Sequence, residues 1–331
     1  MREITLSKAV NEAIAEEMRR DPSVFLIGED VAEAGTPFKV LAGLVDEFGT
    51  GRVIDTPISE PGFTGIAVGA ALTGSRPIVD LMFGDFLFLV MDQLCNQAAK
   101  ACYMSGGKLN VPMVLRTNMG ATRRSAAQHS QSLHALVAHI PGLKVAMPSS
   151  AYEAKGLLKT AIRDNNPVVI FEDKLMYQDK AEVPEKEYLI PFGEANIVRP
   201  GRDVTFVATS SMVQVALAAA GTLAAEGIEA EVIDPRTIVP LDEATILESV
   251  RRTSRAVVID EGHQSYGASA EIAARISEKA FYHLDAPVIR MGAMDVPVPF
   301  SPALEDLTVP TAEGLAANAR RIVAGELVHA A

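Results

Sequence analysis

Polar segments of the sequence follow apolar stretches at several points, which is where open α/β sheets build their functional sites. Glu60 lies in the string DTPISEPGF, directly before a run of small residues. His129 lies in AAQHSQS, among four other side chains that can form hydrogen bonds. Because carboxyl and imidazole groups are common agents of proton transfer, Glu60 and His129 are the first candidates for chemistry.

These residues also have structural interpretations that the sequence leaves open. A glutamate at the start of a helix is stabilised by the helix dipole, so Glu60 needs no ligand to explain it. A single histidine is more often structural, although its polar neighbours favour a functional role for His129. The Asp-Asn-Asn-Pro string at 164–167 is typical of a turn between a helix and a strand. Phe83 and Phe88 fit positions in a hydrophobic core.

The elements that must position these segments alternate between helical and strand hydrophobic periods. Helices are expected at 6–18, 63–72, 86–103, 151–163, 212–226, 243–252, 269–281 and from about 311. Strands are expected at 24–27, 77–82, 111–116, 143–147, 167–171, 203–208, 230–233, 256–259 and 286–291. The strands are apolar on both faces, as in parallel sheets that helices cover on both sides. The alternation predicts an α/β fold with two doubly wound domains.

The alternation breaks between residues 178 and 201, where three prolines and a dense group of charges occur. We interpret this stretch as a linker, or as an edge element plus a linker. A length of 331 residues also suits two domains. The predicted domains are 1–185 and 186–331, and the second should hold about four parallel strands.

The composition argues against several classes of partner. Thirty Lys and Arg against 42 Asp and Glu give a net charge of −12, which does not suit binding to nucleic acid. No apolar run reaches the ~18 residues of a membrane span, so no membrane is expected either. The first twenty residues mix acids with bases, which predicts no secretory signal or transit peptide and favours the cytoplasm. Dinucleotide and phosphate-loop motifs are incomplete, because Ile54 and Leu109 stand where these motifs require other residues.

Seven strings resemble one protein family, in order and nearly from end to end. They are GED at 28–30, DTPISE at 55–60, GIAVGAAL at 65–72, AAQHSQS at 126–132, HIPGLKV at 139–145, AIRDNNPV at 161–168 and DVPVPFSP at 295–302. The chain is similar to the β subunit of thiamine-diphosphate-dependent 2-oxo acid dehydrogenases, which include pyruvate, branched-chain and acetoin dehydrogenase complexes. The resemblance implies a thiamine-diphosphate pyrimidine-binding domain followed by a transketolase-like C-terminal domain.

The resemblance also implies roles for individual residues. Glu60 matches the glutamate that hydrogen bonds a ring nitrogen of the aminopyrimidine and promotes deprotonation of the thiazolium carbon. Phe86 matches the aromatic residue that stacks on the pyrimidine, Ile58 a neighbour that shapes the site, and Glu29 a member of an acidic network. His129 matches a histidine that stabilises an anionic intermediate or transfers a proton during acyl transfer to a lipoyl group.

A potassium site that supports the cofactor loop is a further implication of the resemblance. A cage of carbonyl and other hard oxygen ligands suits an alkali cation. The turn interpretation of the string at 164–167 is compatible with this role. The matching positions are Met113, Ala161, Ile162, Asp164 and Asn166.

The resemblance further implies that this chain is half of an active site. In the family an α subunit holds the diphosphate and Mg²⁺ with a Gly-Asp-Gly motif, whereas Gly84-Asp85 is followed here by Phe86. Two α and two β chains form a heterotetramer that passes its acyl group to a lipoylated dihydrolipoyl acyltransferase core. We therefore predict decarboxylation of pyruvate or cleavage of acetoin. The alternatives are a branched-chain 2-oxo acid as substrate, half of a split transketolase, and a non-catalytic assembly subunit.

Overall fold

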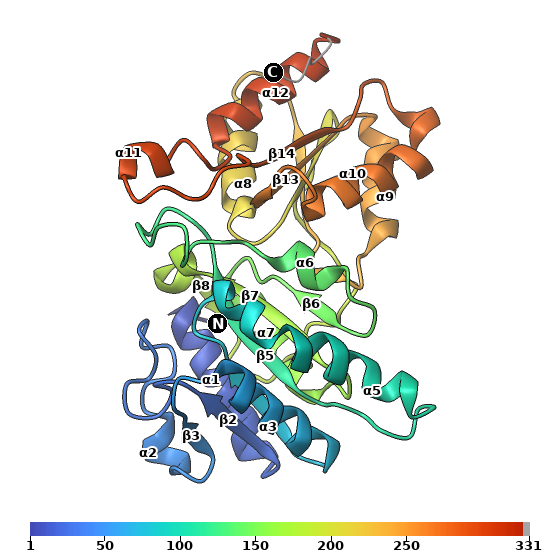
Figure 1. Cartoon of the computed structure of the whole chain (residues 1–331). Helices are drawn as coiled ribbons and strands as arrows, with labels where there is room; N and C mark the ends of the chain where they lie inside the picture. Colours follow the sequence, from blue (N-terminus) through green and yellow to red (C-terminus); the bar gives the residue numbers. More distant parts are fainter. Residues whose placement is uncertain (327–331) are drawn as a thin grey trace.

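Two α/β domains follow one another along the chain, and Figure 1 shows the first below the second. The computed structural model describes residues 1–326, so residues 327–331 at the end of the predicted second domain lie outside the described residues. Each domain holds a largely parallel sheet with helices on both faces. This arrangement confirms the predicted fold class.

The sheet of the first domain has seven strands in the order β12-β6-β7-β5-β4-β2-β3. Neighbouring strands run parallel from β6 to β3, and β12 at the edge is antiparallel. Runs of Val, Ile and Leu suit strands that are buried on both faces. The bounds are β2 (Val24–Gly28), β3 (Val53–Asp55), β4 (Arg76–Asp80), β5 (Val114–Met119), β6 (Lys144–Ala146), β7 (Val168–Asp173) and β12 (Thr237–Val239).

Helices cover both faces of this sheet because successive strand residues point to opposite sides. Ile78 packs in one core with α1 (Leu6–Arg20) and α7 (Ala151–Arg163). Val79, the next residue of β4, packs in a second core with α3 (Glu60–Leu72). The sheet therefore separates two hydrophobic cores.

The helix predicted at 86–103 is a series of shorter helical pieces. A 3-10 turn at Gly84–Phe86 leads into α4 (Leu87–Met91), a π-helical stretch at Asp92–Ala98 and α5 (Ala99–Met104). Hydrophobic periodicity indicates a helical face, but it does not distinguish an α-helix from a π-helix. The backbone hydrogen bonds of a π-helix span one residue more than those of an α-helix. All pieces cover the same sheet face as α3.

The sheet of the second domain has five strands in the order β14-β13-β10-β11-β9. Four are parallel, as predicted, and β9 is an antiparallel edge strand. Helices α8 and α12 cover one face, while α9 and α10 cover the other. The bounds are β9 (Asn196–Arg199), β10 (Val204–Ala208), α8 (Met212–Ala224), β11 (Ala230–Asp234), α9 (Glu243–Thr253), β13 (Ala256–His263), α10 (Ala268–Lys279), β14 (Ile289–Ala293) and α12 (Ala312–Val323).

The stretch predicted as a linker contains strands, which favours its second interpretation as an edge element plus a linker. Within it, β8 (Lys180–Val183) pairs antiparallel with β1 (Arg2–Thr5) at the start of the chain. The sequence did not predict β1, because so short a strand depends on a partner far away in the chain. The strand β12 comes from the second half of the chain but joins the first sheet. Short helices lie in the connecting loops, namely α2 (Leu44–Phe48), α6 (His134–Ala138) and α11 (Pro302–Glu305).

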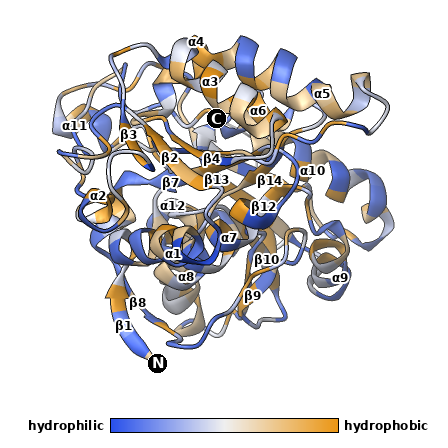
Figure 2. Ribbon diagram, turned by 90° about the horizontal axis from the view of Figure 1, so that it is seen from below, coloured by the Kyte–Doolittle hydropathy of each residue, from blue (hydrophilic) through white to orange (hydrophobic). Residues whose placement is uncertain are grey.

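Apolar residues gather in the strands between the helical layers. In Figure 2 the strands β2, β3 and β13 are orange, whereas α10 carries blue turns toward solvent. Across residues 1–326, no helix is long and apolar enough to cross a membrane.

Candidate functional site

The loops at one edge of the first sheet carry Ile58, described below, and four further predicted site residues. Parallel strands end at the same edge, so residues that follow them gather there. The order of the strands reverses between β2 and β4, the position at which open α/β sheets form a crevice. The four residues are Glu29 after β2, Glu60 after β3, Phe86 after β4 and His129 after β5.

Glu60 and Glu29 form an acidic pair at this edge. Glu60 is the first residue of α3, precedes Pro61 and is 7% exposed. Burial raises the pKa of Glu29, and the negative charges of Glu60 and Asp30 raise it further. The buried Oε1 atom of Glu29 has no hydrogen-bond partner among the described residues. Because an unpaired buried acceptor is costly, this atom fits a ligand that brings an N–H group.

Phe86 and His129 meet in an aromatic cluster at the same edge. Their ring centroids are 5.6 Å apart, with the ring planes at 79°. Phe83 contacts both, at 5.8 Å from Phe86 and 4.6 Å from His129. Such edge-to-face contacts are favourable and fix the orientation of the rings. Phe88 is 56% exposed, so the core interpretation is wrong for that residue, whereas Phe83 packs within the cluster.

Side chains from two other loops hold the backbone around His129. The Lys174 ammonium group donates to the His129 carbonyl, and the Gln131 amide donates to Asp85 Oδ1 at 2.8 Å. Burial lowers the pKa of Lys174, although nearby acids such as Asp85 oppose this effect. Sequence analysis had included Gln131 among the polar neighbours of His129 but missed Asp85 and Lys174. The available signal was position, since Asp85 follows β4 and Lys174 follows β7 at the same sheet edge.

Ile58 lies in the loop between β3 and α3, two residues before Glu60, and is 84% exposed. A large apolar side chain in this position is accessible to a ligand or to another chain. The predicted role of Ile58 in shaping the site stays a prediction.

A buried charge network lies inside the sheet next to this edge. Arg116 of β5 pairs with Asp80 of β4 and Glu172 of β7, and the Tyr177 hydroxyl donates to Glu172 at 3.0 Å. Burial raises the pKa of Asp80, while the Arg116 charge opposes the rise. The charge of Asp80 contributes to the raised pKa of Glu29. Sequence reasoning missed this network, because its members are far apart along the chain.

Two cationic side chains hold the turn between α7 and β7, where a potassium ion is expected. Asp164 Oδ1 accepts from the backbone N–H and the side-chain amide of Asn166, both at 2.8 Å. Burial opposes ionisation, but hydrogen bonds from Lys144 and Asn166 hold the pKa of Asp164 below its ordinary value. The Arg76 guanidinium donates to the carbonyl groups of Ile162 and Asp164 at 3.0 Å each.

These contacts test whether a potassium ion fits the turn. The carbonyl of Ala161 accepts from the N–H of Asp164 at 3.2 Å, and that of Met113 accepts from Val168 at 3.0 Å. Each of these carbonyl oxygens keeps a second lone pair that is available to a cation. The positive charges of Lys144 and Arg76 would repel a cation at the same turn. Potassium binding therefore stays a prediction.

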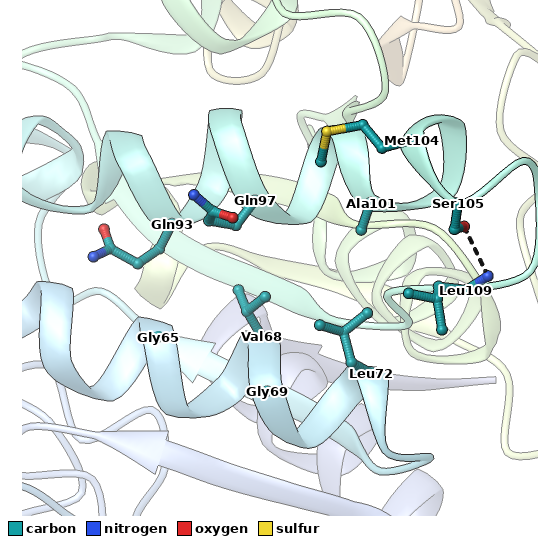
Figure 3. A pocket seen from close by; sticks show the side chains of 10 residues that line it. All are labelled: Gly65, Val68, Gly69, Leu72, Gln93, Gln97, Ala101, Met104, Ser105 and Leu109. Atoms are coloured by element: carbon teal, nitrogen blue, oxygen red, sulfur yellow. Dashed lines mark hydrogen bonds between the residues drawn. The ribbon is translucent and has the colours of Figure 1, made fainter.

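A groove of about 560 Å³ runs between α3 and the helix that ends in α5, and Figure 3 shows its two walls. None of the four site residues lines this groove. A Cβ atom at Gly69 would meet no other atom within 4 Å, so the small residues of α3 keep the groove open. Large apolar side chains on these helices are exposed, namely Ile66, Phe88, Leu89, Tyr103 and Met104. An apolar face of this kind is typical of contact with another protein chain.

Family models match both halves of the chain. The model described as transketolase, pyrimidine binding domain, covers residues 2–180, and transketolase, C-terminal domain, covers residues 193–315. The chain is also 52% identical over 322 residues to acetoin:2,6-dichlorophenolindophenol oxidoreductase subunit beta of Bacillus subtilis, with 94% of each chain covered. This chain belongs to the β subunits of thiamine-diphosphate-dependent acetoin and 2-oxo acid dehydrogenases.

Two other members of this β-subunit family are also about half identical to this chain over most of its length. The acetoin:2,6-dichlorophenolindophenol oxidoreductase subunit beta of Cupriavidus necator is 49% identical, with 98% of each chain covered. The mitochondrial pyruvate dehydrogenase E1 component subunit beta-1 of Oryza sativa is 49% identical, with 97% of this chain and 87% of the relative covered. The family is one of oxidoreductases, and the β subunit described here is part of such an enzyme.

A solved structure supports the fold of this β subunit. It is described as a split gene transketolase, inactive beta4 tetramer, and aligns with a TM-score of 0.81 over 98% of this chain and 99% of that chain. Its sequence identity of 24% makes this likeness evidence for the fold alone.

Proposed function

We propose that this β subunit and an α-type subunit form the decarboxylase component of a dehydrogenase complex that acts on pyruvate or acetoin. The acyl group would then pass to the lipoyl group of an acyltransferase core. Relatives at 52% and 49% identity are named for acetoin and pyruvate, which supports these two substrates. The observation that carries the proposal is the gathering of Glu29, Glu60, Phe86 and His129 at one sheet edge.

The residues at this edge fit the aminopyrimidine end of thiamine diphosphate. The cofactor, when bound, supplies the carbon nucleophile that attacks the substrate carbonyl. Glu60 would hold a ring nitrogen with its buried carboxyl group, and the unpaired Oε1 of Glu29 would accept an N–H group nearby. Phe86 would offer a flat apolar face to the ring. His129, in contact with Phe86, would hold or move a proton during acyl transfer.

The split-transketolase alternative has a specific observation against it. An enzyme that acts on sugar phosphates needs cationic side chains free to hold the phosphate group. Arg123 and Arg124 are the adjacent arginines of the His129 loop. Arg124 is engaged by Glu305 and Asp306, at 2.7 Å each. The engaged Arg124 thus disfavours a sugar phosphate, and the relatives at about half identity independently favour acetoin or a 2-oxo acid. A branched-chain 2-oxo acid is the second candidate.

The proposed partners are an α-type subunit and a lipoylated acyltransferase core. Two copies of the α-type subunit and two of this chain would form a heterotetramer. The sequence lacks the Gly-Asp-Gly motif, so the α-type subunit would hold the diphosphate and Mg²⁺. The groove and the exposed apolar side chains of α3 and α5 offer a surface for that subunit. A potassium ion would bind in the turn between α7 and β7.

We also propose that the domain boundary lies between residues 185 and 186. This position falls between β8 and β9 and in the gap between the two family matches. Limited proteolysis should cut first between β8 and β9, and a first cut inside either sheet would contradict the boundary.

The proposed location is the cytoplasm, because the two cysteines, Cys95 and Cys102, are free thiols and a reducing compartment keeps thiols in this state. Fractionation of the source cells with an antibody against the chain tests this location, and recovery with a membrane or organelle fraction would contradict it.

The function is tested by co-expressing the chain with an α-type subunit that carries the Gly-Asp-Gly motif. Reduction of 2,6-dichlorophenolindophenol is measured with and without thiamine diphosphate, using pyruvate, acetoin, a branched-chain 2-oxo acid and a ketose phosphate. We expect the highest kcat/KM with pyruvate or acetoin, and no activity for the chain alone. A stable complex that binds the cofactor but turns over none of these substrates would contradict the proposal.

A further inference from the structure

The loop between β5 and α6, residues 120–133, carries His129, and both of its ends contact the C-terminal domain. At one end, the Ala121 N–H donates to Glu261 Oε1 at 2.7 Å. At the other end, Nε2 of His134 lies 2.9 Å from Asp260 Oδ2. Asp260 and Glu261 are consecutive residues of β13, and both are buried. One strand of the second domain therefore holds both ends of the loop.

The helix α11 of the second domain adds contacts inside the loop. The Thr122 N–H donates to Glu305 Oε1 at 2.6 Å. The Arg124 guanidinium donates to Glu305 Oε2 and to Asp306, at 2.7 Å each. Glu305 is fully buried although it lies on a four-residue helix. Its two carboxylate oxygens are thus both committed to the loop.

The backbone of the loop shows why it needs these contacts. Thr122, Arg124 and Ala126 have φ values of 67°, 59° and 58°, in the left-handed region that side chains disfavour. Residues held in such conformations persist only where the surroundings determine them. The loop therefore does not owe its shape to its own sequence preferences.

A second buried carboxyl group lies beside Glu261. It belongs to Asp173 at the end of β7, and the carboxyl groups of both residues lie against Gly120. Burial, together with the negative charge of Asp173, raises the pKa of Glu261 well above its ordinary value. The Ser211 hydroxyl donates to Glu261 Oε2 at 3.3 Å, while Glu261 Oε1 accepts from Ala121.

We propose that Glu261, with Asp260 and Glu305, positions His129 from the C-terminal domain, so that the contact between the domains sets the geometry for acyl transfer. These are positioning residues, because they act through the loop and not on the substrate. The inference rests on the proposed role of His129 in the transfer to a lipoyl group.

The test uses the complex with the α-type subunit and compares two reactions. Reduction of 2,6-dichlorophenolindophenol reports the steps before acyl transfer, and acylation of a lipoylated domain reports the transfer itself. We expect Glu261→Leu to lower lipoyl acylation by about 10–100-fold and dye reduction much less, because a small displacement of a reacting group has a large effect on rate. His129→Ala should show the same separation.

Two further variants serve as controls for Glu261→Leu. Glu261→Gln should keep both activities, since the amide oxygen accepts from Ala121 and the amide N–H groups are available to Asp173 and Ser211. Glu248→Leu makes the same change at an exposed position of α9 and should have no effect.

Amide hydrogen exchange of residues 120–131 gives a readout that does not depend on activity. Glu261→Leu should speed exchange in this segment and leave α8 unchanged. If Glu261→Leu does not fold, Arg124→Ala, whose side chain is 36% exposed, should show the same change on a smaller scale. Folded variants with wild-type exchange and a wild-type ratio of the two activities would overturn the proposal. A wild-type complex without activity would contradict the proposed function, while the exchange experiment would still decide whether the second domain holds the loop.

Discussion

At the scale of residues, an acidic pair and an aromatic cluster meet where parallel strands end. Glu60 is buried at a helix start, and Glu29 beside it has an unpaired oxygen and a raised pKa. Phe86 and His129 are held edge to face. In the proposed function, these four residues would provide a proton-handling carboxyl group, an acceptor, an apolar face and an imidazole.

Replacement of Glu60 by Gln should lower turnover of the complex by about 10²–10⁴-fold, because an amide cannot exchange a proton with the pyrimidine ring. The melting temperature should change little, since Gln has the same shape. Dye reduction and thermal unfolding measure the two effects. Glu278→Gln, at an exposed position of α10, is the matched control. Full activity of Glu60→Gln would remove this residue from the mechanism.

A second carboxyl group gives a pH-dependent prediction for stability. Asp234 ends β11, is fully buried and accepts from the Ser149 hydroxyl. Burial, and then the charge of Glu153, raises the pKa of Asp234 to about 7. The unfolded value is about 3.9, so the folded chain keeps a proton that the unfolded chain loses within this window. The contribution of Asp234 to the free energy of unfolding should therefore fall as the pH rises from about 4 to about 7, by up to ~1.4 kcal/mol per pH unit.

Urea unfolding of the wild type and of Asp234→Asn at several pH values between about 5 and about 8 measures this contribution. The difference in the free energy of unfolding between the two proteins should change with pH up to about 7 and become constant above it. Asp46→Asn, at an exposed position, is the control. A difference that does not vary with pH would show that Asp234 titrates at its ordinary value.

At the scale of elements, strand ends and the loops after them decide where the chemistry is placed. The loop of residues 120–133 follows β5, whose sheet position places His129 beside the turn after β4. The turn between α7 and β7 is held by Lys144 and Arg76, which reach it from β6 and β4. In both cases a neighbouring element supplies the contacts that the loop lacks.

The turn between α7 and β7 allows a test of the potassium proposal. Asp164→Ala should lower the free energy of unfolding by about 1–3 kcal/mol, because it removes hydrogen bonds from Lys144 and Asn166. If potassium binds, the wild type should also be more stable in KCl than in NaCl at equal ionic strength. Asp164→Ala should lose this difference, and Asp46→Ala should keep it. Equal stability of the wild type in both salts would rule out a specific potassium site.

At the scale of the whole molecule, two surfaces of the first domain are suited to contacts with other parts. One is contacted by the second domain, and the other is exposed. The C-terminal domain contacts the His129 loop through β13 and α11. The groove between α3 and α5 differs, because its exposed apolar side chains are not covered by any part of the described chain. We therefore expect the site to be complete only when the domains and a partner chain are assembled.

Gly69→Phe should prevent assembly with the α-type subunit and leave the chain folded. The new side chain enters open space in the groove, because no atom beyond the neighbouring residues and backbone of its own helix lies within 4 Å of a Cβ at this position. Gly221→Phe is the matched control, since Gly221 is also a helical glycine with open space around it, in α8. Size-exclusion chromatography with the α-type subunit measures assembly. A normal complex with Gly69→Phe would show that the groove is not the contact surface.

Several features of the fold could be predicted because local patterns carry them. The helix at 151–163 was predicted with its observed bounds, and most strands lie within a few residues of their predicted positions. The edge strands β1 and β12 could not be predicted, since each pairs with a strand far away in the chain. Glu29, Glu60, Phe86 and His129 were named from the sequence, whereas Lys174, Glu261 and Glu305 were not.

The sequence by itself determined the α/β alternation, the family and the residue types at the sheet edge, because hydrophobic periods and local strings depend on neighbours in the chain. Only the tertiary structure decided which distant groups meet. Ala121 of the first domain donates to Glu261 of the second, and the carboxyl groups of Asp173 and Glu261 lie against the same glycine, Gly120. Such contacts join residues from separate domains, and the burial that raises the pKa of Glu261 arises only when the domains pack together.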